Sequence, residues 1–135
     1  SDSLEQVNQQ TSKELNNVGN YLATFTLDTS YLPVLVQNKQ DSNYYSILYK
    51  LKTDLSNTLA SLSLIQGLFV FPATSQQFIY AAANSEEQLT AQKLREIFRE
   101  AYAGGSLKDF VNQYWYPLEI DGHAYLLRVL NIGEG

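Results

Sequence analysis

The spacing of the apolar residues changes near residue 65, and this change limits what the chain can fold into. Before it, apolar side chains recur every three or four residues, which is the period of an amphipathic helix. After it come short apolar runs separated by turn-forming residues, a pattern typical of strands. Two helices followed by two strand pairs, with one more helix between the pairs, predict an α+β fold. An antiparallel sheet would pack against helices in the order α-α-β-β-α-β-β.

A long first helix is predicted over residues 1–28. Its apolar positions follow one another at a mean spacing of about 3.5 residues, the coiled-coil period. These positions are Leu4, Val7, Thr11, Leu15, Val18, Leu22 and Phe25. A helix of this length extends roughly 40 Å, which is long for a small domain. We therefore expect it to pack on another helix or on its own copy in a dimer.

A second helix is predicted from about residue 42 to residue 64. Pro33 and the polar stretch at 37–43 interrupt the first pattern, and Asp41 or Ser42 is a suitable N-cap. The apolar residues then form one clean face of a helix. They are Ile47, Leu48, Leu51, Leu55, Leu59 and Leu62.

Two apolar runs and a third helix follow. Residues 67–73 and 77–84 are joined by a short polar segment and predict a hairpin. Asn84 or Ser85 is the expected N-cap of the next helix, and Gln88 three residues after Ser85 matches a capping box. The buried face of this helix is expected to hold Leu94, Ile97, Phe98, Ala101 and Tyr102. Residues 106–112 are expected to add one helical turn.

A second hairpin is predicted around Asp121-Gly122, because this dipeptide favours a two-residue type I′ turn. Such a turn places Ile120 opposite His123 and Trp115 opposite Arg128. One face of the hairpin is then a core face, made of Tyr116, Leu118, Ile120, Tyr125, Leu127 and Val129. The other is mixed, made of Trp115, Pro117, Glu119, Ala124, Leu126 and Arg128. The second strand therefore reads as buried on both faces, with a guanidinium group as the exception.

The charge and composition exclude several classes of partner. The formal net charge is −5, and the nine basic residues are scattered along the chain. This disfavours binding to nucleic acid or to an anionic membrane surface, which both require clustered Lys and Arg. The chain has no Cys, so a disulfide framework is excluded, and it has no Met. Because an open reading frame begins with Met, we expect a processed chain or a piece of a larger protein.

The residues that could carry catalysis have simpler roles. His123 is the only histidine, and it lies at the predicted hairpin turn, where an exposed turn residue is the expected role. Glu86 and Glu87 fall in the first turn of the third helix, where acidic side chains interact favourably with the helix dipole. We therefore predict that this domain is not an enzyme and that it holds no metal and no cofactor.

The chain resembles a known class of bacterial receptor domain. The resemblance is carried by the two long N-terminal helices, by "LIQGLFVFPATSQQFIYAAANS" at 64–85 and by "DGHAYLLRVLNIGEG" at 121–135. This combination is similar to the extracytoplasmic PAS-like (Cache) sensor region of membrane-bound histidine kinases, of the type paired with AraC-family response regulators. Such regions often hold two PAS-like modules, and a last strand after "NIGEG" is expected in the family.

The resemblance implies a single extracytoplasmic domain over 1–135, in which 1–64 form the helical part and 65–135 the PAS-like sheet with one helix. It implies a ligand-sensing domain of a two-component histidine kinase, on the outer side of the cell membrane, that signals by rearranging its helices. The ligand would be a small molecule or an extracellular protein. The same module on a chemoreceptor or a cyclic-dinucleotide enzyme is an alternative, and so is a helical adaptor that binds a protein partner.

Arg128, Trp115, Tyr80 and Glu119 are the candidate ligand-binding residues. Arg128 could receive an anionic ligand group beside the indole of Trp115, since its planar fork of donors suits a carboxylate. Alternatively, Arg128 is structural and lies across the sheet, paired with Glu119 or with a helix carboxylate. Tyr80 is a lesser candidate: it precedes three alanines that leave room beside the strand, but packing of the third helix onto these alanines explains them more simply.

Overall fold

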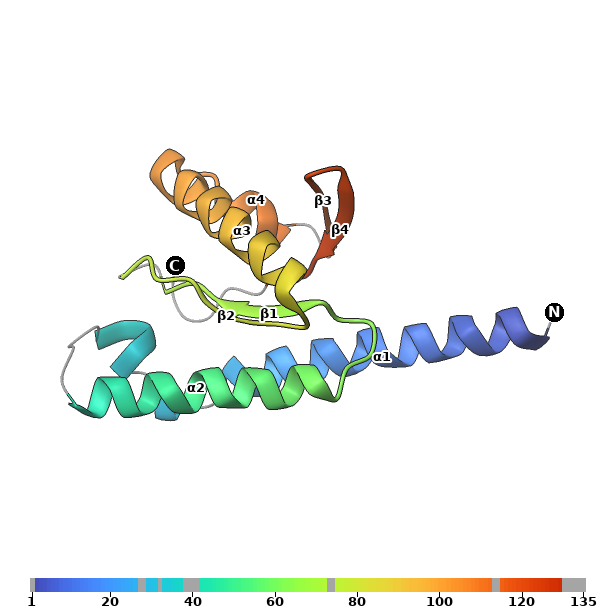
Figure 1. Ribbon diagram of the computed structural model, residues 1–135, viewed down its shortest axis with the longest axis horizontal. Helices are drawn as coiled ribbons and strands as arrows, with labels where there is room; N and C mark the ends of the chain where they lie inside the picture. Colours follow the sequence, from blue (N-terminus) through green and yellow to red (C-terminus); the bar gives the residue numbers. More distant parts are fainter. Residues whose placement is uncertain are drawn as a thin grey trace.

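The computed structural model describes residues 2–26, 29–31, 33–37, 42–72, 75–112 and 115–129, and the fold is α+β in the predicted order (Figure 1). The helices are α1 (Asp2–Thr26), α2 (Ser42–Ala60), α3 (Ser85–Gly104) and the short α4 (Lys108–Asn112). A 3-10 turn, η1 (Thr29–Tyr31), and a π-helical turn, η2 (Pro33–Gln37), connect α1 to α2. The strands are β1 (Gly67–Val70), β2 (Ile79–Ala82), β3 (Tyr116–Ile120) and β4 (His123–Leu127).

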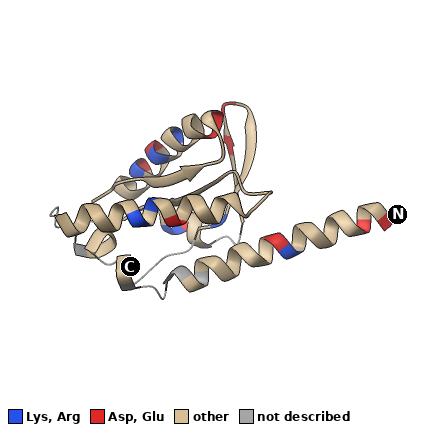
Figure 2. Ribbon diagram, turned by 60° about the horizontal axis from the view of Figure 1, so that its bottom comes forward, with Lys and Arg blue, Asp and Glu red and all other residues tan. Residues whose placement is uncertain are grey.

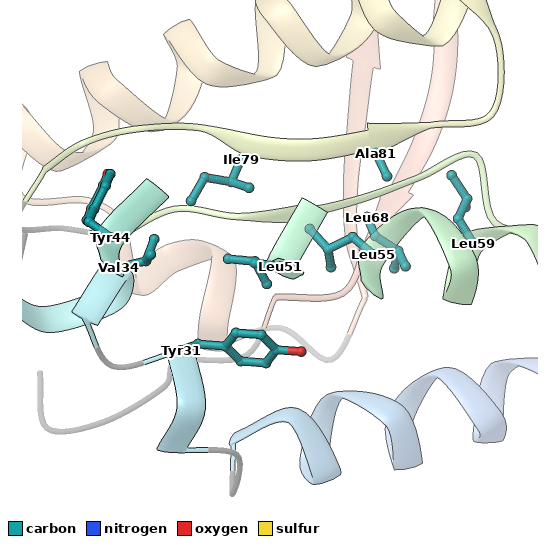
Figure 3. Packing of buried hydrophobic residues seen from close by; sticks show 9 residues of the cluster. All are labelled: Tyr31, Val34, Tyr44, Leu51, Leu55, Leu59, Leu68, Ile79 and Ala81. Carbon is teal, nitrogen blue, oxygen red and sulfur yellow. The ribbon is translucent and has the colours of Figure 1, made fainter. Parts of the chain in front are cut away.

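The first core lies between α2 and the β1–β2 hairpin (Figure 3). The predicted stripe of α2 supplies it, because Leu51, Leu55 and Leu59 are buried, and Tyr44 near the start of the helix is buried with them. Its buried members are Tyr31, Val34, Tyr44, Leu51, Leu55, Leu59, Leu68, Ile79 and Ala81. Residues of η1 and η2 close one end of this core, so the segment around Pro33 folds onto α2 rather than extending away from it.

The β1–β2 hairpin separates this core from a second one, because alternate side chains of a strand point to opposite faces. Leu68 and Ile79 face α2, whereas Phe69 and Phe78 pack against the cluster of α3. The rings of Phe69 and Phe78 stack with centroids 4.9 Å apart. The buried members of the second core are Leu94, Phe98, Ala101, Phe110 and Ile120. Ala81 belongs to the first core, so α3 does not account for this alanine as the sequence suggested.

Helix α3 begins and ends with well-defined caps. Asn84 is the N-cap, and its side-chain oxygen accepts a hydrogen bond from the backbone N–H of Glu87 at 3.0 Å. Ser85 is already the first helical residue, so the capping box with Gln88 is not formed. At the other end Gly105 adopts a left-handed conformation with φ of 74°, which a residue with a side chain adopts less readily.

The β3–β4 hairpin has the predicted turn and register. Asp121 and Gly122 have φ values of 52° and 79°, as a type I′ turn requires. Ile120 pairs with His123, and the register continues to Tyr116 opposite Leu127. The two hairpins form two separate two-stranded antiparallel sheets within the described residues. A single PAS-like sheet is therefore not formed by this part of the chain, and the "NIGEG" segment lies outside the described residues.

Leu51 tests the first core because its side chain is completely buried. We expect Leu51→Ala to lower the free energy of unfolding by about 2–5 kcal/mol, since it removes apolar contacts and leaves a cavity. Urea denaturation followed by circular dichroism measures this change. Lys52→Ala, at the exposed neighbouring position, is the control and should have little effect. Equal effects of the two substitutions would contradict the packing described for α2.

Candidate functional site

The four predicted site residues do not converge on one place. Trp115 immediately precedes β3 and Arg128 immediately follows β4, so these two flank the open end of the hairpin. Glu119 pairs with Ala124, four residues before Arg128, which corresponds to roughly 13 Å along a strand. Tyr80 lies on β2 in the other sheet, opposite Phe69. The structure thus places Trp115 and Arg128 at the same end of one hairpin and separates Glu119 and Tyr80 from them.

The outward face of the β3–β4 hairpin is exposed, which corrects the prediction that β4 is buried on both faces. Pro117, Glu119 and Ala124 are exposed, and the side chain of Leu126 is 67% exposed. The inward face packs in the second core as predicted. The reason is that α3 covers one face of this hairpin, while no other described element lies over the opposite face.

Arg128 is half-buried and contacts the backbone of the residue that follows it. Its Nη1 donates a hydrogen bond to the carbonyl oxygen of Val129 at 3.3 Å. The side chain of Val129 packs in the second core, so this bond anchors the guanidinium at the edge of that core. Glu119, the proposed carboxylate partner, is exposed nearer the turn. These contacts favour the structural role of Arg128, and its role in binding a ligand stays a prediction.

Polar contacts that the sequence pattern did not indicate attach the β3–β4 turn to α3. Lys93 forms an ion pair with Asp121. The hydroxyl of Tyr125 lies 3.3 Å from a carboxylate oxygen of Glu87. His123 Nε2 lies 3.8 Å from a carboxylate oxygen of Glu86, and both side chains are exposed. His123 therefore lies at an exposed turn, as its position in the sequence predicted.

A hollow of about 270 Å³ lies where α2 ends and the chain turns into β1. It is lined by Ser56, Leu59, Ala60, Leu62, Ser63, Ile65, Gln66, Ala82 and Ala83. Its lining residues are apolar or carry neutral polar groups, and none of them is charged. None of the four predicted site residues lines it. No sequence motif marks this hollow, because it is built from the end of a helix, a loop and the end of a strand.

Helix α1 runs antiparallel to α2 (Figures 1 and 2), and side-chain contacts join it to α2 and to the loop after α2 at two places. At the first, Glu14 accepts hydrogen bonds from the hydroxyl of Ser63 at 2.8 Å and from the backbone N–H of Leu64 at 2.5 Å. These two donors lie in the loop that lines the hollow. One carboxylate therefore connects the helix to the wall of this hollow.

The second junction is a cluster of polar groups that α1, η1 and α2 contribute. The hydroxyl of Tyr31 donates to Asp54, and Lys50 lies 3.2 Å from the same carboxylate. Burial raises the pKa of Tyr21 on α1, a side-chain hydrogen bond with Thr58 lowers it, and the negative charge of Asp54 raises it further. Burial is the largest of these effects, so Tyr21 is held in its neutral form against α2.

The part of α1 that precedes Glu14 extends past the end of α2 (Figures 1 and 2). Val18 is buried, and Leu15 and Leu22 are half-buried, so the middle of the predicted stripe packs on the body. Leu4 and Val7 lie on the extension, where they are 61% and 58% exposed. The side chain of Phe25 lies outside the described residues.

Comparisons with family models, with curated proteins and with solved structures found no match to this chain. Among the helices of the described residues, none has the length and apolar character that crossing a membrane requires.

Arg128→Ala distinguishes the two roles of this residue. We expect it to lower the free energy of unfolding by about 0.5–1.5 kcal/mol, because it removes a hydrogen bond and the packing of the side-chain stem. Urea denaturation measures the change, with Arg95→Ala at an exposed position of α3 as the control. Unchanged stability together with a loss of acetate binding, measured by calorimetry, would instead indicate an anion site.

Tyr21 makes the stability of the domain sensitive to alkaline pH. Its pKa is raised in the folded state, so above the ordinary tyrosine pKa of 10.0 the unfolded chain loses its proton first. We therefore expect the free energy of unfolding to fall as the pH rises through about 10 and above. Tyr21→Phe should reduce this fall. Urea denaturation at about pH 8 and above about pH 10 measures the free energy of unfolding at both ends of the range. Tyr49→Phe, at an exposed position, should leave it unchanged.

Proposed function

We propose that this chain is the ligand-sensing extracytoplasmic domain of a membrane-bound sensor histidine kinase and that α1 carries its signal. The observation that supports the proposal most is the arrangement of α1. Its middle packs on the body, whereas its first turns extend past α2 with Leu4 and Val7 exposed. An extension of this kind suits a helix that reports to an element outside the domain.

The length of α1 suits transmission over a distance. The helix has 25 residues and therefore spans about 38 Å at a rise of about 1.5 Å per residue. A shift at Glu14 or Tyr21 would move the distant end of the same rigid element. The coiled-coil spacing of the stripe supports packing of this end against a second copy, where a rotation or a slide of one helix changes the packing of the pair.

The contacts that hold α1 contribute free energies small enough for ligand binding to outweigh them. A hydrogen bond to a charged group contributes about 1.5–3 kcal/mol. Shifting an equilibrium from 1:99 to 99:1 requires a difference in binding free energy of about 5.5 kcal/mol between the two states. A ligand that favours one position of α1 would therefore have to outweigh only a few such contacts, and its differential affinity sets the response.

A helical adaptor is the second candidate, and the exposure of Leu4 and Val7 also favours it. Against it, Leu15, Val18 and Leu22 in the middle of the stripe are already buried or half-buried, so only the exposed first turns of α1 present apolar side chains to another protein. The same sensor module on a chemoreceptor or on a cyclic-dinucleotide enzyme shares the proposed role of α1, because the output domain is a separate part of such receptors.

Engineered cysteines test whether two copies meet along the stripe, since the chain has no Cys of its own. We expect Val7→Cys to form a disulfide-linked dimer under mild oxidation, because Val7 lies on the proposed contact face. Gln9→Cys, on the opposite side of the same helical turn, is the matched control and should form much less dimer. Non-reducing electrophoresis gives the readout. Equal cross-linking at both positions, or at neither, would contradict the dimer.

The coding sequence on either side of this chain tests the receptor proposal directly. We expect apolar spans of about 20 residues on both sides and a histidine kinase domain after the second span. An output domain of another class behind two such spans would favour the chemoreceptor or the cyclic-dinucleotide enzyme. A gene without such spans would contradict the membrane receptor and favour the adaptor.

A further inference from the structure

The hollow at the end of α2 and the attachment of α1 share one loop. Leu62, Ser63, Ile65 and Gln66 line the hollow. Ser63 and Leu64 also donate hydrogen bonds to Glu14 of α1. Ser63 therefore belongs both to the wall of the hollow and to the junction with the helix. A molecule that displaces the loop must also displace the donors that hold Glu14.

The chemistry of the hollow indicates the class of ligand. Its volume of about 270 Å³ lies just below the range of typical small-molecule sites, about 300–1,000 Å³, so only a small ligand fits. Leu59, Leu62 and Ile65 offer apolar surface, and Ser56 and Gln66 offer hydrogen-bonding groups. The lining holds no charged side chain that could pair with a charged ligand. The lining therefore fits a small uncharged molecule that combines an apolar part with one polar group.

The C-terminal end of α2 favours a ligand that carries a hydrogen-bond donor. The last residues of the helix, including Leu59 and Ala60, line the hollow, and the C-terminal end of a helix carries partial negative charge. The carboxylate of Glu14 lies on the other side of the same loop. Both groups disfavour an anionic ligand. A primary amide, which carries N–H donors and no net charge, satisfies this environment.

We propose that this hollow binds a small uncharged amphiphilic molecule and that Ser63 and Glu14 pass its binding to α1. The proposal rests on the sensor function proposed above and names the site and ligand class for it. Binding changes the position of the loop, the two hydrogen bonds to Glu14 change with it, and the extension of α1 responds. Glu14 is a positioning residue in this scheme, because it acts on α1 without touching the ligand.

Isobutyramide is a suitable probe, since it joins a branched apolar group to a primary amide. We would titrate it into the ¹⁵N-labelled domain and record the backbone amide shifts. Isobutyrate and isobutylammonium, of similar shape but opposite charges, serve as comparison ligands. We expect saturable shifts at Gln66, Ala82 and Ala83 with isobutyramide, and at least several-fold weaker binding of the two charged compounds.

Two pairs of variants test separately whether the hollow binds the probe and whether Glu14 passes this binding to α1. Ala60→Trp places a large side chain at the hollow, and Ala103→Trp makes the same change at an exposed position near the end of α3. We expect only Ala60→Trp to abolish the shifts. In the unmodified domain we also expect the probe to shift backbone amides between residues 4 and 13. Glu14→Ala should keep the shifts around the hollow and lose those between residues 4 and 13. Glu5→Ala, on the exposed part of the same helix, should keep both sets.

Each result decides one part of the proposal. Absent shifts in the unmodified domain, or equal shifts in both tryptophan variants, would overturn the binding site. Tighter binding of a charged compound would overturn the ligand class. Shifts in α1 that survive Glu14→Ala would overturn the coupling through Ser63. The sensor function is tested separately by the gene. A titration without shifts would overturn the binding site, whereas a gene without membrane spans would overturn the sensor function.

Discussion

The β1–β2 hairpin is the element on which the rest of the structure depends. A two-stranded ribbon is at best marginally stable alone, because it buries too little apolar surface. Here α2 covers one face and α3 covers the other, and the alternation of Leu68 with Phe69 supplies apolar side chains to both. The ribbon orders the two helices in turn, since each of them packs its buried stripe against one face of it.

The local patterns predicted those features that depend on neighbouring residues. The stripe of α2 followed from the spacing of its leucines, and the turn at Asp121-Gly122 followed from the tolerance of these residues for positive φ. The inward face of the second hairpin followed from the register that this turn sets. In each case one local period or one turn determined the outcome, and the structure confirms it.

Features that depend on distant contacts could not be predicted in this way. The apolar run of β4 indicated burial on both faces, but the exposure of Leu126 depends on what covers the hairpin, and α3 covers only its inner face. Glu14 and Ser63 are 49 positions apart, and neither stands out in its local pattern. The hollow is likewise assembled from separate segments. Of the four residues that the sequence indicated, only Trp115 and Arg128 lie at the same end of a hairpin, and no local pattern indicated the loop that joins the hollow to α1.

The separation of the two cores by a single ribbon has a consequence for how the sequence can vary. Substitutions in α2 and in α3 act on opposite sides of the ribbon and share few contacts, so their effects on stability should be nearly additive. The strands contribute to both cores, because successive residues such as Leu68 and Phe69 point to opposite faces of the ribbon. The side that carries α1 can therefore diverge in sequence while the packing beneath α3 stays as it is.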